Sequence, residues 1–490
     1  MNYLAFDLGG SSGKLNLCHF DGERLFLEDI IRFGNEPIAV NKCLYWDFLN
    51  IYSQMNLGIR KAVSVAEGPI RSIGMDSFSN DFAFIDVRGE MLTPLRCYRD
   101  KRTELHKAAI YAKMSPERLY ALTGNQVAPF NTLMQLAAMR EAGQGFILEN
   151  AYKLLLTPDL LAYFMTGEVS SEYTIASVSQ MFDFSTADWN DEILAAFGIP
   201  RSLLCGIVKP GTVVGRSREN YNRELGFPGL DVVSVCEHDT ASAFLAAVSV
   251  GDRAIISSGT WSLVGTEVPT PIIDDYGYRH NIANEGGLGN RHRLVRNVMG
   301  LWIVQELGRL YKSRGQDISF EDMENAAEAS TPFAHRIDPD DPVFFSPGNM
   351  EDAITGHCRE WGGAVPQTMG QTIRCVLESL AFKYRWAIEK IEGLTGRSLP
   401  VVNIVGGGSR NKLLCRFTAN ACGRPVLAGP SDATVLGNVL VQLLADRRIS
   451  SIEDGKELVR KSFPIQEYLP SEQSLWEGKY LDFKKHFNLD

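Results

Sequence analysis

The chain has 490 residues, which is more than one hydrophobic core usually organises, so two large domains are expected. Its 45% hydrophobic and 22% charged residues are ordinary for a globular protein. The net charge of -10 argues against nucleic acid or an anionic membrane as the main partner, and no apolar run approaches the roughly 20 residues of a membrane span.

The N-terminus and the cysteines indicate a cytoplasmic protein. Residues 1–7 have no basic segment and no long apolar segment, so no signal peptide is expected. The nine cysteines are scattered without a Cys-x-x-Cys pair, which is typical of buried, reduced thiols. Cys415 and Cys422 lie seven residues apart, and a redox role for them stays open.

The first part of the chain predicts strand, turn and strand, followed by a helix and more strands. Alternating and apolar runs mark the strands, and apolar residues every three or four positions mark the helix. The expected strands are 3–8, 14–20, 25–33, 70–75 and 82–86, the helix is 48–66, and residues 76–81 form a polar loop.

Residues 102–197 have mostly helical spacing and predict a helical insertion in the first domain. Two helices in it begin at the pairs Ser115-Pro116 and Thr157-Pro158, since proline is favoured at the first helical position. A β-branched strand at 232–235 and a helix at 241–248 follow.

A new unit begins near residue 251, and it repeats the order of the N-terminus. Strand 254–257, a Ser/Gly/Thr turn and strand 261–264 correspond to strand 3–8, its glycine turn and strand 14–20, which indicates a duplication. The remaining elements are expected as a loop at 284–287, helices at 299–311, 372–394, 411–421 and 434–446, a strand at 401–405, and a C-terminal strap from about 470 packed on a domain.

Asp239 is the first candidate for chemistry. It lies between the strand 232–235 and the following helix, where backbone N–H groups and the helix dipole favour a carboxylate. Such a carboxylate can point at an incoming group. The same pattern also fits an ordinary N-cap at Asp239 or Thr240.

Three turns of small residues each follow a short strand: 9–13, 257–260 and 406–409. Glycine allows close backbone approach and Ser/Thr adds hydroxyl donors, so such turns suit a polyphosphate, although each alone also fits a plain tight turn. Asp7, at the tip of the first strand, could hold Mg²⁺ through water or simply cap its turn. The sequence has no P-loop, dinucleotide fingerprint or zinc-protease motif, and its eight histidines predict no structural metal.

Several segments together resemble the FGGY carbohydrate kinases, and the resemblance runs nearly end to end and in order. The matching segments are 7–14, 98–103, 129–133, 238–243, 257–263, 284–287, 297–302 and 406–408. The resemblance implies an α/β fold of two ribonuclease H-like domains, of the actin and hexokinase ATPase type, with a cleft between them. It also implies a sugar-binding domain at 1–246 and a nucleotide-binding domain at 247–490.

The resemblance implies a role for each matched position. Asp239 would be the general base that takes the proton of the sugar hydroxyl, and Asp7 would hold Mg²⁺. The residues expected to bind ATP are Gly10, Ser11, Ser12, Gly13, Lys14, Thr260, Gln305 and Gly407. The residues expected to bind the sugar are Ser79, His238, Thr240 and Asn297. Phosphoryl transfer needs little beyond such positioning and charge neutralisation.

Within the family, the segments 129–133 and 297–302 resemble the branch that phosphorylates L-rhamnulose. In that branch the loop after Asp76 reads Thr-Trp-Gly-Val-Asp, whereas here residues 77–81 read Ser-Phe-Ser-Asn-Asp. The change leaves the kinase reaction intact, and L-rhamnulose, phosphorylated by ATP at a primary hydroxyl, stays the expected substrate. L-fuculose, ribulose and xylulose are the alternatives. A sugar sensor without turnover and an actin-like ATPase are the alternatives of another class. The expected partners are ATP and the sugar, and the protein is expected as a monomer or homodimer.

Overall fold

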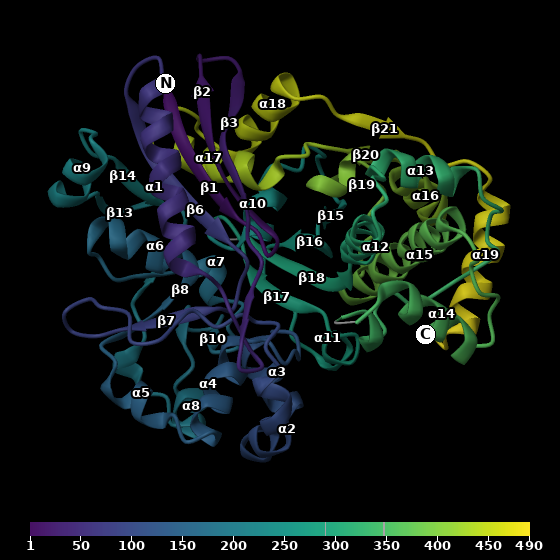
Figure 1. Ribbon diagram of the computed structural model, residues 1–490, viewed down its shortest axis with the longest axis horizontal. Coiled ribbons are helices and arrows are strands. Elements are labelled where there is room, and N and C mark those ends of the chain that lie inside the picture. The colour runs from purple at the N-terminus through teal and green to yellow at the C-terminus, as the bar shows by residue number, and fades with distance from the viewer. Residues whose placement is uncertain (290, 346–347) are drawn as a thin grey trace. The chain divides into compact units, whose positions relative to one another are not determined.

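The apolar run at the N-terminus becomes a central strand of a six-stranded sheet in the computed structural model, which describes residues 1–289, 291–345 and 348–490. β1 pairs antiparallel with β2 and parallel with β6, β14 continues parallel to β6, and β13 closes that side antiparallel (Figure 1). The sheet order is β3 (Leu25–Gly34), β2 (Ser12–Phe20), β1 (Asn2–Leu8), β6 (Ile70–Ser77), β14 (Asp231–Ser234) and β13 (Thr212–Arg216).

A second sheet repeats this order. β15 pairs antiparallel with β16 and parallel with β19, β20 continues parallel to β19, and β21 closes that side antiparallel. The strands are β16 (Trp261–Val268), β15 (Ala254–Ser258), β19 (Val402–Val405), β20 (Val426–Ala428) and β21 (Gln466–Tyr468). The shared topology supports the duplication that the sequence predicts.

The chain divides into two compact units, and each unit consists of three separate segments of the chain. The first comprises Met1–Ala246, Glu267–Leu294 and Ala433–Ser462, and the second comprises Ala247–Thr266, Val295–Asp432 and Phe463–Asp490. The predicted boundary between the two family domains, at residues 246 and 247, stays a prediction, because the first unit contains residues from both sides of it. Two segments from the later half of the chain therefore belong to the same unit as the N-terminal sheet.

Helices cover the first sheet. α17 packs on β1 and β6, α1 on β2 and β3, and α6 on β6 and β13, and Figure 1 shows the late helices α17 and α18 beside the early strands. The helices of this layer are α1 (Phe48–Val65), α6 (Thr157–Thr166), α9 (Glu219–Leu225), α10 (Asp239–Leu245), α17 (Ala433–Ala445) and α18 (Ile452–Ser462).

The predicted helical insertion is present and has a hydrophobic core of its own. Its α3 begins with Ser115 as N-cap and Pro116 in the first turn, as the sequence predicts. The further helices of the first unit are α2 (Arg102–Lys113), α3 (Pro116–Thr123), α4 (Thr132–Glu141), α5 (Gly145–Asn150), α7 (Tyr173–Ala176), α8 (Asp191–Phe197) and α11 (Asp275–Arg279). Its small strands are β4 (Ile38–Val40), β5 (Cys43–Tyr45), β7 (Phe82–Ile85), β8 (Lys153–Leu156), β9 (Ser171–Glu172), β10 (Phe182–Asp183), β11 (Asp188–Trp189) and β12 (Ile207–Val208).

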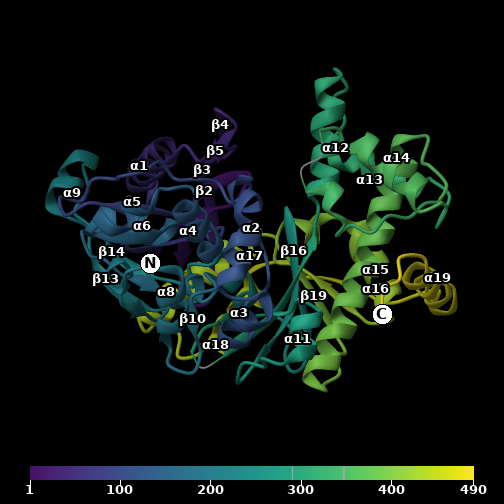
Figure 2. The ribbon, with the colours of Figure 1, turned by 90° about the horizontal axis from the view of Figure 1, so that it is seen from below.

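The second unit is organised around the long helix α15, which packs against α13 and α16. The predicted C-terminal strap is a helix, α19, which contacts α16 and buries Trp476, Tyr480 and Phe483 (Figure 2). The helices are α12 (Trp302–Ser313), α13 (Phe320–Glu328), α14 (Met350–Glu360), α15 (Met369–Thr395), α16 (Lys412–Cys422) and α19 (Gln473–His486). Among the described residues, no helix combines the length and apolar character needed to cross a membrane.

Two predicted elements are wrong. The expected loop at 284–287 is mostly a buried strand, β17 (Ala283–Gly286), because Asn284 satisfies its amide through the backbone of Ile272 and Gly124. The helix expected from residue 299 begins only at Trp302, since β18 (His292–Met299) runs through the start of that apolar pattern.

Candidate active site

Polar side chains gather where three parallel strands of the first sheet end. Asp7 of β1 lies opposite Asp76 of β6 in the strand register. Beyond β14, the chain bridges back to β6 at Ser77 and His238, and the Ser77 N–H donates to the Glu237 carbonyl at 2.9 Å. The carboxyl edge of parallel strands is where open α/β sheets bind their ligands.

Asp239 is the first residue of α10 and is not its N-cap. His238 occupies the cap position and makes no side-chain capping bond, so the N-cap alternative for Asp239 or Thr240 is wrong. Oδ1 of Asp239 accepts from the Thr240 N–H at 2.6 Å and the Thr240 hydroxyl at 3.2 Å. Nε2 of His238 lies 3.5 Å from the same oxygen. Within the described residues these contacts converge on Oδ1, which leaves Oδ2 for an incoming group.

The electrostatics of Asp239 suit a proton acceptor. Burial raises the pKa of its carboxyl, His238 opposes that rise, and the charge of Asp7 adds to it. The side chain is still 30% exposed, so a ligand can reach it. A carboxylate with a raised pKa takes a proton more readily than a free aspartate does.

Asp76 is a site residue that sequence reasoning missed. Its side chain is fully buried, and Oδ2 accepts from the Asn438 amide at 2.7 Å, while Oδ1 has no partner within the described residues. Burial and the nearby charge of Asp7 raise the pKa of its carboxyl. A polar residue at the end of an apolar strand, as at Asp7, is the signal that could have identified it.

Asp7 itself is paired with Lys14 across the hairpin, with Nζ and Oδ2 3.5 Å apart. No group of three or more potential ligands among the described residues forms a metal site. A carboxylate placed like that of Asp7 suits Mg²⁺, which proteins commonly hold with one or two carboxylates together with substrate phosphates. Asp7, with the partnerless oxygen of Asp76 beside it, could supply those carboxylates.

The turn at Gly9–Lys14 requires its glycines. The Gly9 N–H donates to the Ser12 carbonyl at 2.9 Å, which closes the turn. A Cβ on Gly10 would lie 2.9 Å from the Tyr98 hydroxyl oxygen, and one on Gly13 would lie 2.3 Å from the Phe33 ring. Ser11, Ser12 and Lys14 are half-buried, so they remain accessible at the hairpin tip.

The loop at 77–81 turns most of its unusual residues inward. Phe78 stacks on Trp46, with ring centroids 4.6 Å apart. Asn80 adopts a φ of 75°, and its amide donates to the Ser79 hydroxyl and accepts from the Thr132 N–H. Ser79 alone in this loop is half-exposed, and it is therefore the loop residue available to a ligand.

Behind His238 lie two buried charged residues, Arg293 and Glu285, for which no role was predicted. The Arg293 Nη2 is 2.9 Å from Oε2 of Glu285, and both side chains are 1% exposed. Both residues belong to the segment Glu267–Leu294 of the first unit. Glu285 lies in the segment 284–287 that carries the family resemblance, which was the available signal.

The second unit carries the other predicted residues. Thr260 and Gln305 lie together, with Oγ1 3.5 Å from Oε1. Gly407 is exposed and begins a short 3₁₀ helix (Gly407–Arg410), and the neighbouring Gly408 is packed so closely on Ser258 that a Cβ would lie 2.1 Å from its hydroxyl. Asn297 of β18 is half-buried, and its Oδ1 has no partner within the described residues.

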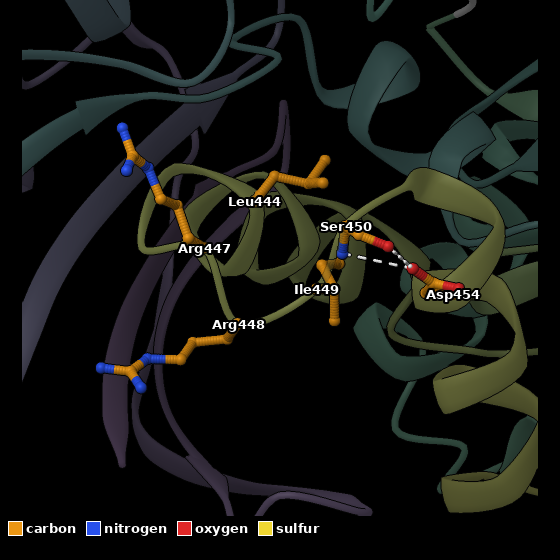
Figure 3. Close-up of a pocket in the computed structure, with 6 residues that line it drawn as sticks. All are labelled: Leu444, Arg447, Arg448, Ile449, Ser450 and Asp454. Atoms are coloured by element: carbon orange, nitrogen blue, oxygen red, sulfur yellow. Dashed lines mark hydrogen bonds between the residues drawn. The ribbon is translucent and has the colours of Figure 1, made fainter.

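An open pocket after α17 contains none of the predicted site residues (Figure 3). Arg447 and Arg448 point away from Ser450 and Asp454, whose hydrogen bonds cap the turn before α18. Arg448 is paired with Asp446 at 3.1 Å. This pocket therefore adds nothing to the carboxylate site.

Comparison with known proteins places these features in one family. Residues 2–246 match the FGGY family of carbohydrate kinases, N-terminal domain, and residues 254–445 match its C-terminal domain. A rhamnulokinase of Bacteroides thetaiotaomicron is 37% identical over 99% of both chains, and one of Bacillus subtilis is 33% identical over 96% of both. Two solved structures share the fold: a ligand-bound xylulose kinase of Lactobacillus acidophilus (TM-score 0.83, 15% identity, 99% and 98% covered) and a Plasmodium falciparum glycerol kinase with ADP (0.77, 16%, 99% and 97%). The chain belongs to the FGGY family of carbohydrate kinases.

Proposed function

We propose that this protein transfers the γ-phosphoryl group of ATP to a primary hydroxyl of L-rhamnulose, giving L-rhamnulose 1-phosphate. The observation that carries the proposal is Asp239, whose Oδ1 is held by Thr240 and whose carboxyl interacts electrostatically with those of Asp7 and Asp76. The rhamnulokinases that match along nearly the whole chain support this choice of sugar.

In the proposed reaction, Oδ2 of Asp239 accepts the proton of the sugar hydroxyl as its oxygen attacks the phosphorus. His238, Thr240, Ser79 and Asn297 orient the sugar. Orientation provides much of the acceleration in phosphoryl transfer because the base has little chemistry to do.

The residues predicted to bind ATP lie in both units. The accessible turn at Gly10–Lys14 and the residues Thr260, Gln305 and Gly407 would bind ATP through backbone N–H groups and short polar side chains. Mg²⁺ held at Asp7 would neutralise charge on the phosphates when bound. The nine free cysteines fit a reducing cytoplasm, where ATP is also available.

A second candidate is the same reaction on another ketose, and Ser79 is the observation that favours it. A hydroxymethyl group stands where the L-rhamnulose branch has glycine, and this side chain is half-exposed. A smaller ketopentose would tolerate it more easily.

An ADP-release assay with ATP and Mg²⁺ separates these candidates. The panel is L-rhamnulose, L-fuculose, L- and D-ribulose, D-xylulose and glycerol. We expect the highest kcat/KM with L-rhamnulose. A higher kcat/KM for a pentulose would change the assigned substrate but not the proposed mechanism. Sugar-independent ATP hydrolysis with no phosphorylated sugar would contradict the kinase assignment.

A further inference from the structure

His238 contacts a buried ion pair, Arg293 with Glu285, through its ring nitrogen Nδ1. The Arg293 Nη2 lies 3.1 Å from Nδ1 of His238 and 2.9 Å from Oε2 of Glu285. The Arg293 Nε donates to the Gly286 carbonyl at 2.9 Å, and the guanidinium lies 5.6 Å from the Phe244 ring centroid. The guanidinium is therefore held through Nε and Nη2 and on one face, whereas Nη1 has no hydrogen-bond partner within the described residues.

An arginine side chain donates hydrogen bonds and accepts none. Because Nη2 of Arg293 donates toward Nδ1 of His238, that nitrogen is the acceptor, which places the ring proton on Nε2. The opposite tautomer would direct an Nδ1–H at Glu285, whose Oε2 is 3.4 Å away, and would place it against the guanidinium donors. The shorter contact at 3.1 Å favours the Nε2–H tautomer.

The backbone of this segment is fixed independently of the ring. The His238 N–H donates to the Thr174 hydroxyl at 3.2 Å, and the preceding Glu237 N–H donates to the buried Glu172 carboxylate at 3.2 Å. The ring nitrogen Nε2 then faces Oδ1 of Asp239 at 3.5 Å. A protonated Nε2 at this place directs its positive edge at the oxygen that Thr240 already holds.

We propose that Arg293, held in place by Glu285, is a positioning residue for phosphoryl transfer: it fixes His238 as an Nε2–H donor toward the sugar and Asp239. With Oδ1 of Asp239 surrounded by donors, only Oδ2 accepts the substrate proton. This proposal rests on the proposed kinase function for its catalytic consequence, whereas the tautomer itself does not depend on any activity.

The test is nitrogen-15 NMR of the histidine imidazoles in the full-length protein, with His238 assigned by loss of its signals in His238→Gln. The chain has eight histidines, so the spectrum is tractable. We expect the Nδ1 shift of an unprotonated nitrogen and the Nε2 shift of a protonated one. A protonated Nδ1 in the wild type, or values averaged between the two nitrogens, would overturn the proposal.

The matched variant is the double substitution Glu285→Leu with Arg293→Met, which removes both charges together so that neither is left buried alone. We expect averaged His238 shifts, a kcat for the sugar reduced about 10- to 100-fold, and an ATP KM within about twofold of wild type. Replacing the buried pair Arg374–Glu378 of α15 by Met and Leu is the control, and it should leave the His238 shifts unchanged.

The outcomes separate the two claims. A folded Glu285→Leu/Arg293→Met variant with wild-type kcat contradicts the positioning role even if its stability is lower. Wild-type enzyme that shows the Nε2–H tautomer but phosphorylates no sugar contradicts the proposed function and leaves the tautomer assignment standing. If the double variant does not fold, the wild-type spectrum still decides the tautomer.

Discussion

The helix that carries Asp239 packs closely on α17 at Gly437, and Gly437→Ala should disturb both stability and catalysis. A Cβ on Gly437 of α17 would lie 1.8 Å from the Ser242 carbonyl oxygen of α10 and 2.5 Å from its carbonyl carbon. Carbon and oxygen approach normally to about 3.3 Å, so the two helices must separate by about 1.5 Å.

The displaced helix is expected to be α10. α17 is tied to the sheet by the Asn438 amide, which donates to Asp76 at 2.7 Å, and by the Gln442 amide, which donates to the Leu4 carbonyl at 2.8 Å. We expect a loss of about 1–3 kcal/mol in the free energy of unfolding, as for other overpacked cores. Because Asp239 begins α10, a shift of this size should also lower kcat/KM by about 100-fold.

The assay is urea denaturation followed by fluorescence, together with kcat/KM for the preferred ketose. Gly356→Ala in α14 is the matched control, since a Cβ there meets no atom within 4 Å. That variant should be unchanged or more stable by about 0.5–1 kcal/mol, because alanine favours a helix over glycine. A Gly437→Ala protein with wild-type stability and activity would refute the packing argument.

Three further changes have definite expected results. Ser79→Gly should raise kcat/KM for L-rhamnulose severalfold and leave the pentuloses nearly unchanged, and a loss with every sugar in the same assay would contradict this. Asp239→Asn should be more stable than wild type at pH 8, because the raised pKa of Asp239 means that its ionisation destabilises the folded state. The difference in thermal midpoint between the two proteins should shrink as the pH falls toward 4. A difference that grows would count against the pKa shift. Trp476→Ala should lower the free energy of unfolding by about 3–5 kcal/mol, because the ring is only 2% exposed. Leu475 is 45% exposed, so Leu475→Ala should change that free energy by no more than about 0.5 kcal/mol. Equal denaturation curves for the two variants would contradict the packing role of α19.

Regular elements were predictable where local pattern and tertiary packing agree. The strands at 3–8 and 14–20 are confirmed as β1 and β2, and the helix at 372–394 is confirmed within α15. Each has a clear alternation or a helical apolar face that packing reinforces. Asn284 is the opposite case: its polarity indicates a loop, and only the distant backbone of Gly124 and Ile272 makes it acceptable in a buried strand.

The same distinction holds for the site. Asp7 and Asp239 could be predicted because each comes at the end of an apolar strand, and the glycine-rich turns could be predicted from their composition. Arg293 and Asp76 were not, since their importance comes from partners far along the chain: Arg293 meets His238 across 55 residues, and Asp76 meets Asn438 across 362. Pairings of that kind depend on strand order, which a single sequence does not specify.

The most direct test of the central claim is ADP release by wild type and Asp239→Asn with saturating ATP, Mg²⁺ and L-rhamnulose, with sugar binding measured by calorimetry on both proteins. The account predicts that kcat falls by about 10²–10⁴-fold in the variant while the sugar still binds, because a general base contributes about that much and Oδ1 retains its donors. Undiminished turnover in Asp239→Asn would contradict the assignment of Asp239 as the base.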